Sequence, residues 1–136
     1  MSHIYEQAVV WRDLDAYAHV NNAVYATYLE NARLAFLGAL SQEAGENFQV
    51  ILAEHTIRYR SQAHLSDRLL IETSIREVRN SSFVMVATIK EATEGRLVVE
   101  SEAILVHFDY ENGRPIPVGT AWRERLLQGP AVPSTR

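Results

Sequence analysis

The sequence predicts an α+β fold in which one long helix packs against an antiparallel sheet. A single segment with helical periodicity, residues 22–40, follows one short β-prone segment near the N-terminus. Four further β-prone segments then follow one another, joined by turns and with no helix between them. Consecutive strands of this kind favour antiparallel pairing, and a lone helix with a broad apolar face needs a sheet to cover it.

The N-terminal elements are a short strand and the helix. Residues 5–12 contain the β-prone run AVVW. In residues 22–40 the apolar side chains recur at three- and four-residue steps, which is the helical period. They are Val24, Tyr25, Tyr28, Leu29, Ala32, Ala35, Phe36 and Leu40. Gly38 leaves the end of this helix open. Glu30 and Arg33 are spaced to pair on the helix surface, with a role at an interface as the alternative.

The later strands are expected at residues 48–60, 67–79, 82–92 and 96–108. The second of them alternates, so that Leu69, Ile71, Thr73 and Ile75 share one face. The third is apolar on both faces, which indicates an interior strand. Asn112-Gly113 marks the following turn, and residues 120–127 are expected to form a short terminal helix.

Composition limits the function. A chain of 136 residues fits one domain, residues 1–136, with residues 129–136 expected to be a flexible tail. The net charge of −4 argues against a nucleic-acid partner. The absence of cysteine excludes disulfides and thiolate metal sites. No apolar run approaches a membrane span, and the N-terminus does not resemble a signal peptide. We therefore expect a cytoplasmic protein.

The segment DLDAYAHVNN, just before the helix, carries the chemistry of interest. It holds Asp13, Asp15, His19, Asn21 and Asn22 within ten residues. Helix capping explains one of them, since asparagine and aspartate oxygens accept the free N–H groups at a helix start. A metal site is the second reading, but no H-E-x-x-H pattern exists and the other histidines are scattered. We expect neither a metal nor another cofactor.

Catalysis is the third reading. A helix N-terminus presents unpaired N–H groups and partial positive charge, which stabilise an oxyanion on a carbonyl under attack. Asp15, seven residues before Asn22, is close enough for the chain to fold back toward the helix end. Such a carboxylate attacks the carbonyl or activates a water. We expect Asp13 to be structural, turning the chain between strand and helix.

The run VVWRDLDAYAHVNNAVYATYLENAR resembles the hotdog-fold thioesterases, specifically the 4-hydroxybenzoyl-CoA thioesterase-like family. The family pattern is D-x-D-x-x-G-H-V-N-N followed by a Y-x-x-Y-x-E-x-x-R helix. The segments IRYRSQAHLSDRLLIET, VRNSSFVM and ENGRPIPV extend the resemblance over nearly the whole chain. This chain departs from the pattern at Ala18, where the family often has glycine, and at Ser61, where it often has proline.

The resemblance implies a hotdog fold, a homodimer or a dimer of dimers with active sites at the subunit interface, and hydrolysis of an acyl-CoA thioester. It matches Asp15 to the catalytic carboxylate, as nucleophile or general base, and the Asn22 backbone N–H to the oxyanion donor. His19 is expected to assist catalysis by orienting Asp15 or touching substrate, and Asn21 to shape the site.

Further residues are candidates for substrate binding. A loose positive cluster suited to CoA phosphates consists of Arg58, Arg60, His64 and Arg68, of which Arg60 and His64 are the binding candidates. Ser81 and Ser82 are candidates for the nucleotide end, and Tyr25 for the pocket wall. A hotdog dehydratase and a non-catalytic acyl-CoA or acyl-carrier binding module are the alternatives. A binding module would be free to lock Asp15 in an ion pair, for example with Arg12 or Arg33.

Overall fold

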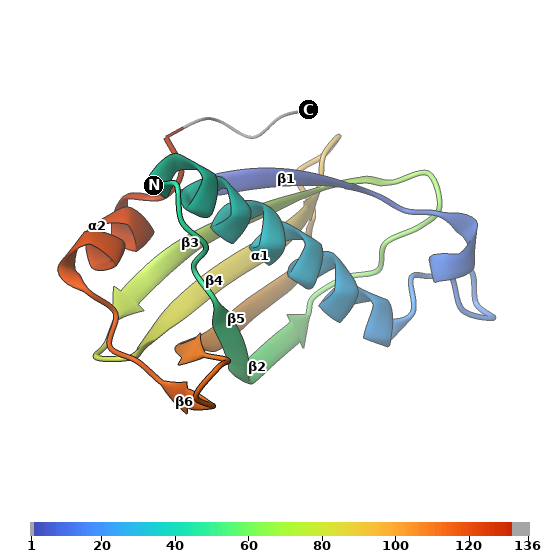
Figure 1. Cartoon of the computed structure of the whole chain (residues 1–136). Helices are drawn as coiled ribbons and strands as arrows, with labels where there is room; N and C mark the ends of the chain where they lie inside the picture. Colours follow the sequence, from blue (N-terminus) through green and yellow to red (C-terminus); the bar gives the residue numbers. More distant parts are fainter. Residues whose placement is uncertain (1, 132–136) are drawn as a thin grey trace.

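The computed structural model describes residues 2–131 and consists of one curved antiparallel sheet with a long helix lying across it (Figure 1). The elements are β1 (His3–Ala8), a 3₁₀ turn (Trp11–Asp13), α1 (Asn22–Ala44), β2 (Val50–Tyr59), β3 (Arg68–Val78), β4 (Ser82–Glu91), β5 (Leu97–Asp109), β6 (Arg114–Pro115) and α2 (Thr120–Gln128). The order of one long helix followed by consecutive strands is the one predicted.

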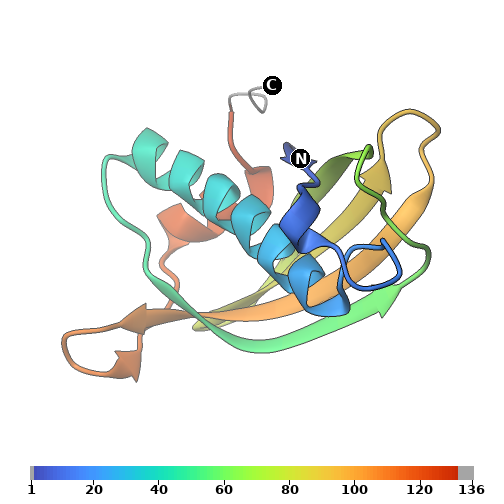
Figure 2. The same ribbon diagram turned by 90° about the vertical axis from the view of Figure 1, so that its right-hand side faces the viewer.

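The sheet has the strand order β1-β3-β4-β5-β2, and every neighbouring pair is antiparallel. The strand expected to be interior, β4, lies between β3 and β5 and buries both faces near its start. The short β6 pairs only with the end of β5. β2 is an edge strand, and so is β1. Figure 2 shows the sheet curving around α1.

The core lies between α1 and the concave face of the sheet. Leu69, Ile71, Thr73 and Ile75 of β3 all point into it, as their alternation predicts. The helix covers them with Leu29, Ala32, Phe36 and Leu40, each no more than 2% exposed. At the far end, α2 closes the core with Trp122 and Leu126.

The boundaries of the N-terminal elements differ from the prediction. β1 ends at Ala8, so the apolar run that follows is not strand: Val9 is buried, and Trp11 begins a 3₁₀ turn. Helix α1 runs past Gly38 to Ala44 and ends at Gly45, whose φ of 71° supplies the left-handed cap. Gly38 is tolerated because it lies on an exposed face, with no atom near the position of a Cβ.

Of the predicted tail, residues 132–136 lie outside the described part of the chain. Gly129 and Pro130 are buried. The Ala131 N–H donates to the Glu43 carboxylate at 2.9 Å. The first residues of the predicted tail are therefore held against the C-terminal end of α1.

Candidate active site

The loop before α1 is closed on itself around Asp15. Leu14 and Val20 form an antiparallel bridge. The Asp15 N–H donates to the His19 carbonyl at 2.8 Å. One carboxylate oxygen of Asp15, Oδ1, accepts the N–H of Tyr17 at 2.8 Å and of His19 at 3.3 Å. The side chain is exposed, and no ion pair among residues 2–131 includes it. Asp15 thus has a fixed position and a free second oxygen.

Ala18 is the residue of this loop with unusual backbone geometry. Its φ is 64°, and it is the one residue other than glycine with positive φ in the described chain. The tight turn from Asp15 to His19 requires this conformation, since the Ala18 N–H donates back to the Asp15 carbonyl at 3.1 Å. Alanine in the left-handed region is strained, which explains why a glycine suits this position.

The N-terminus of α1 leaves a backbone donor open beside this loop. Asn21 is the N-cap, and its side-chain oxygen accepts the Ala23 N–H at 2.9 Å. Within the described residues, no hydrogen bond uses the N–H of Asn22, the first helical residue. The capping reading is therefore right for Asn21, while the Asn22 N–H remains available to an external acceptor at the positive end of the helix dipole.

Asp13 has the structural contacts that the sequence predicts for it. Its carboxylate accepts the Tyr28 hydroxyl at 2.6 Å and the Val10 N–H at 3.2 Å. Its backbone carbonyl accepts the Asn21 N–H at 2.9 Å. Asp13 thus joins the 3₁₀ turn, the N-cap and the second turn of α1.

A second loop, residues 60–67 between β2 and β3, packs against the first. The His19 and His64 rings meet edge to face, with centroids 5.2 Å apart. Val20 donates to the Ala63 carbonyl at 3.0 Å. The structure therefore brings together His19 and His64, which the sequence proposed separately as catalytic and binding candidates.

Asp67 and Arg96 hold this second loop, and the sequence analysis missed both. The Asp67 carboxylate accepts the His64 N–H at 2.9 Å and lies 3.3 Å from the Arg96 guanidinium. Arg96 also donates to the Ser61 hydroxyl at 2.8 Å. Ser61, which replaces the proline of the family pattern, bonds in turn to the Leu97 carbonyl. The bond between Asp67 and His64 is local, and the spacing of the two residues in the sequence could have indicated it. The sequence does not indicate Arg96, which precedes β5, as the partner of Asp67.

Tyr25, a predicted pocket-wall residue, is only 1% exposed. Its hydroxyl accepts the Ala63 N–H at 3.1 Å, and its ring contacts those of Tyr28 and Tyr59. Burial raises its pKa, so the hydroxyl stays protonated near neutral pH. In the single chain, Tyr25 supports the second loop and leaves almost no surface for a ligand.

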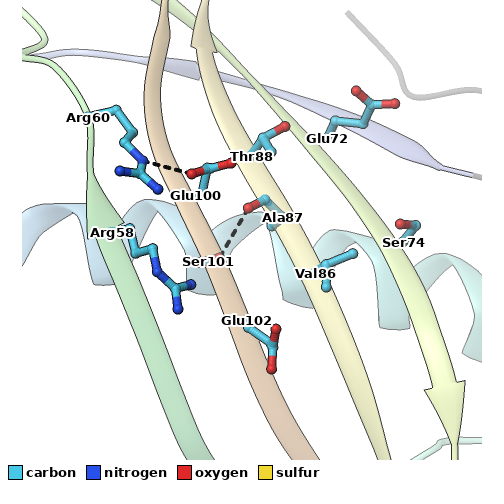
Figure 3. Close-up of a pocket in the computed structure, with 10 residues that line it drawn as sticks. All are labelled: Arg58, Arg60, Glu72, Ser74, Val86, Ala87, Thr88, Glu100, Ser101 and Glu102. Carbon is cyan, nitrogen blue, oxygen red and sulfur yellow. Dashed lines mark hydrogen bonds and ion pairs between the residues drawn. The ribbon is translucent and has the colours of Figure 1, made fainter.

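Arg60 lies on the sheet face opposite α1 (Figure 3). Its guanidinium pairs with Glu100 at 2.7 Å. A groove of about 490 Å³ on this face is lined by Arg58, Glu102 and Thr88 among others. Arg68, another member of the predicted positive cluster, pairs with Glu6. The cluster is thus divided: Arg60 and Arg68 pair with different carboxylates.

Ser81 and Ser82 are not brought near Asp15 within one chain. They lie at the β3–β4 turn, where Ser82 pairs with Val106 near the end of β5. The N-terminus of α1 lies at the other end of the sheet, where the Tyr59 hydroxyl approaches the Asn22 carbonyl at 3.4 Å. Within one chain, the two serines and the N-terminus of α1 therefore lie at opposite ends of the sheet.

The surface beside Asp15 is hollowed and aromatic. A cavity of about 320 Å³ is lined by Trp11, Arg12, Leu14, Asp15, Ala16 and Ala18. Trp11 is 78% exposed and Tyr17 is 81% exposed. The chain before and after Asp15 thus exposes two large aromatic side chains, which indicates a surface that another molecule covers.

Two further features bear on the nature of the site. Within residues 2–131, no group of three or more histidine, aspartate or glutamate side chains has the arrangement of a metal site. No helix in that part of the chain combines the length and apolar character required to cross a membrane.

The predicted surface pair of Glu30 and Arg33 is wrong. The two side chains form no ion pair, and Arg33 is only 9% exposed. Arg33 is buried rather than exposed to solvent, and it lies close to β2, since burial and the charge of Arg33 together lower the pKa of His55 in that strand.

Comparison with known proteins identifies the family. The model of the thioesterase-like superfamily matches residues 9–126. The chain belongs to this superfamily. It is 30% identical over 118 residues to the long-chain acyl-CoA thioesterase FadM of Escherichia coli K12, covering 85% of this chain and 89% of FadM. It is 33% identical over 105 residues to the acyl-CoA thioester hydrolase YbgC of Escherichia coli O6:H1, covering 74% and 78%.

A solved structure supports the same assignment. A thioesterase from Thermus thermophilus, complexed with coenzyme A and zinc, superposes with a TM-score of 0.79 at 28% identity, covering 90% of each chain. The predicted hotdog fold and the predicted membership of the thioesterases are thus confirmed.

Proposed function

We propose that this chain hydrolyses acyl-CoA thioesters to the free acid and CoA, with Asp15 as the catalytic carboxylate and the Asn22 N–H as the oxyanion donor. The observation that carries the proposal is the open N–H at the start of α1, three residues after the closed turn that fixes Asp15. The relatives FadM and YbgC are named for acyl-CoA thioester hydrolysis, which supports the substrate class.

The chemistry follows from this arrangement. The ionised Asp15 carboxylate attacks the thioester carbon or takes a proton from the water that does. In either case negative charge develops on the carbonyl oxygen, where an N–H at the positive end of a helix stabilises it. Collapse of the tetrahedral intermediate expels the CoA thiolate. If water attacks, this step gives the acid directly, and Asp15 passes the proton it took to the thiolate. If Asp15 attacks, this step gives a mixed anhydride, and water then cleaves it to release the acid and restore the carboxylate. Asn21 fixes the helix start, and His19 holds the turn around Asp15 through its backbone.

The state of Asp15 favours a hydrolase over a binding module. A non-catalytic protein would be free to neutralise this carboxylate with Arg12 or Arg33. Neither arginine forms an ion pair with it, and only one of its oxygens is engaged by backbone N–H groups of the described residues. An exposed carboxylate held by its own turn, with one oxygen free, suits a nucleophile or base.

We further propose a homodimer formed through the edge of β2. Ile51, Leu52 and Tyr59 of this strand are 41%, 42% and 49% exposed. An apolar edge strand with free backbone groups is suited to pairing with another chain. Antiparallel pairing of two β2 strands across a two-fold axis places the Val50 end of one copy beside the Tyr59 end of the other.

This pairing gives the predicted binding residues a common site. Ser81 and Ser82 lie at the Val50 end of the sheet and Asp15 at the Tyr59 end. The serines of one copy would then approach the catalytic loop of the other and contact the nucleotide of CoA there. His64, whose ring contacts that of His19, would lie on the approach to the same site.

The test is thiol release from a panel of aliphatic and aromatic acyl-CoAs, followed with a disulfide reagent. The Asp15→Asn variant should lose roughly 10²- to 10⁴-fold in kcat, the usual contribution of a catalytic acid or base. Glu124→Gln, which removes a carboxylate from α2, is the matched control and should retain full activity. Equal turnover by wild type and Asp15→Asn would remove Asp15 from the mechanism. CoA esters that bind but never turn over would support the binding module instead.

A further inference from the structure

Arg33 is a buried cation without a partner in its own chain. It lies in the middle of α1, is 9% exposed, and forms no side-chain hydrogen bond or ion pair within residues 2–131. Burial lowers its pKa, and the charge of Glu30 offsets this only in part. A buried charge without a partner is strongly unfavourable, so an acceptor is expected from outside the chain.

The surroundings of Arg33 open toward the edge of the sheet. His55, in the middle of β2, is close enough that the charge of Arg33 adds to burial in lowering its pKa. Farther along the same flank, a cavity of about 300 Å³ lies between α1 and the start of β2, lined by Leu34, Leu37 and Val50 among others. Leu34 is 62% exposed. The flank is therefore apolar, hollow and positively charged at its centre.

We propose that a second copy of this chain covers this flank and that its Glu30 accepts the hydrogen bonds of Arg33. The inference rests on the dimer proposed above and names the contact at its centre. Glu30 is exposed on α1, one turn before Arg33, and has no ion-pair partner among the described residues.

The order of the charges makes the flank complementary to itself. Residues three apart lie on the same side of a helix, so Glu30 and Arg33 form one negative and one positive position along it. A two-fold axis reverses the direction of the second helix, so that Glu30 of each copy faces Arg33 of the other. Arg33 is near the midpoint of α1 and His55 near that of β2, which is where an axis relating two β2 edges would pass.

A ligand anion is the competing source of the acceptor. Arg33 is eleven residues from Asn22, or about 16 Å along the helix at 1.5 Å per residue. A substrate would reach Arg33 only with an anionic group that far from the thioester carbonyl. The exposed carboxylate of Glu30 needs only the two-fold arrangement, and the opposite charges supply the complementarity that docking of two copies requires.

The experiment is a double-mutant cycle on the dimer dissociation constant, measured by analytical ultracentrifugation. Arg33→Met and Glu30→Gln remove the charges with little change in size, and circular dichroism verifies that each variant folds. Each single change should raise the dissociation constant at least tenfold. The double variant should be no weaker than the worse single variant, since the two residues act as one contact. Glu124→Gln removes an exposed carboxylate of α2, away from the β2 edge; it is the control and should leave the constant unchanged.

Independent effects of the two changes, or an unchanged constant for Arg33→Met, would overturn the proposal. An equal effect of Glu124→Gln would overturn it as well. An Arg33→Met dimer as tight as wild type with a raised KM would assign Arg33 to the substrate. The outcomes for the dimer and for the chemistry are separate: a monomeric wild type that still hydrolyses acyl-CoA would remove this contact alone, and a dimeric wild type without hydrolysis would remove the proposed activity alone.

Discussion

The hydroxyl of Tyr28 donates a 2.6 Å hydrogen bond to the carboxylate of Asp13. This bond joins the second turn of α1 to the chain that precedes the loop around Asp15. Burial, together with the bond to Asp13, raises the pKa of Tyr28, so its hydroxyl remains the donor at all ordinary pH values. Because the Asp13 carbonyl also accepts from the N-cap residue Asn21, the bond fixes the loop around Asp15 relative to the N-terminus of α1.

Tyr28→Phe should therefore reduce both stability and activity. Loss of a hydrogen bond to a charged group lowers the free energy of unfolding by about 1.5–3 kcal/mol, because the carboxylate keeps its desolvation without its donor. Urea unfolding measures the change. Tyr17→Phe removes a hydroxyl that is exposed, since Tyr17 is 81% exposed, and it should leave stability unchanged. Equal stability of the two variants would show that the bond to Asp13 contributes nothing.

Ala18→Gly should stabilise the protein. At a φ of 64°, alanine carries a steric cost of about 1–2 kcal/mol that glycine avoids. The greater freedom of glycine in the unfolded chain offsets part of this, which leaves a gain of about 0.5–1 kcal/mol. Ala16→Gly, in the same loop but without positive φ, should destabilise instead. Thermal unfolding compares them, and a loss of stability in Ala18→Gly would contradict the strained geometry.

The departures from the sequence prediction have physical causes. The alternation in β3 and the helical period of α1 predicted the core, because the buried face of each element appears as a regular repeat of apolar residues in the sequence. The end of β1 was not predicted, because AVVW is apolar in either conformation and tertiary contacts decide where pairing stops. The extension of α1 past Gly38 depends on Gly45 as the cap, which periodicity alone does not reveal.

The candidate site was predicted only in part, because the sequence shows local contacts and does not show contacts between distant segments. The loop around Asp15 is local, and its residues are consecutive, so the sequence shows it. Arg96 precedes another strand, and its bonds to Ser61 and Asp67 follow only from the fold. Arg33 has the spacing of a surface pair, but its direction toward β2 depends on how the helix sits on the sheet.

His3 should make stability depend on pH. It is 8% exposed, its Nδ1 has no partner in the described chain, and burial lowers its pKa. The folded state therefore prefers the neutral imidazole. Its contribution to stability is complete above the unfolded pKa of about 6.5 and is lost as the pH falls below that value.

The measurement is urea unfolding of wild type and His3→Leu between pH 7.5 and pH 5. Wild type should lose more stability over this range than the variant, which has no titrating group at the position. Parallel pH profiles for wild type and His3→Leu would contradict the burial of a neutral His3.

The most direct test of the central claim replaces Asn22 by proline and by alanine and measures kcat/KM for acyl-CoA hydrolysis. Proline removes the backbone N–H together with the side chain, and it is well tolerated at the first position of a helix. The preceding residue, Asn21, already has the extended conformation that proline requires, with a ψ of 140°. Alanine keeps the N–H and removes the side chain. If the Asn22 N–H stabilises the oxyanion, Asn22→Pro should lose about 10²- to 10³-fold while its helix content stays unchanged, and Asn22→Ala should remain active. Full activity in the folded proline variant would contradict the account.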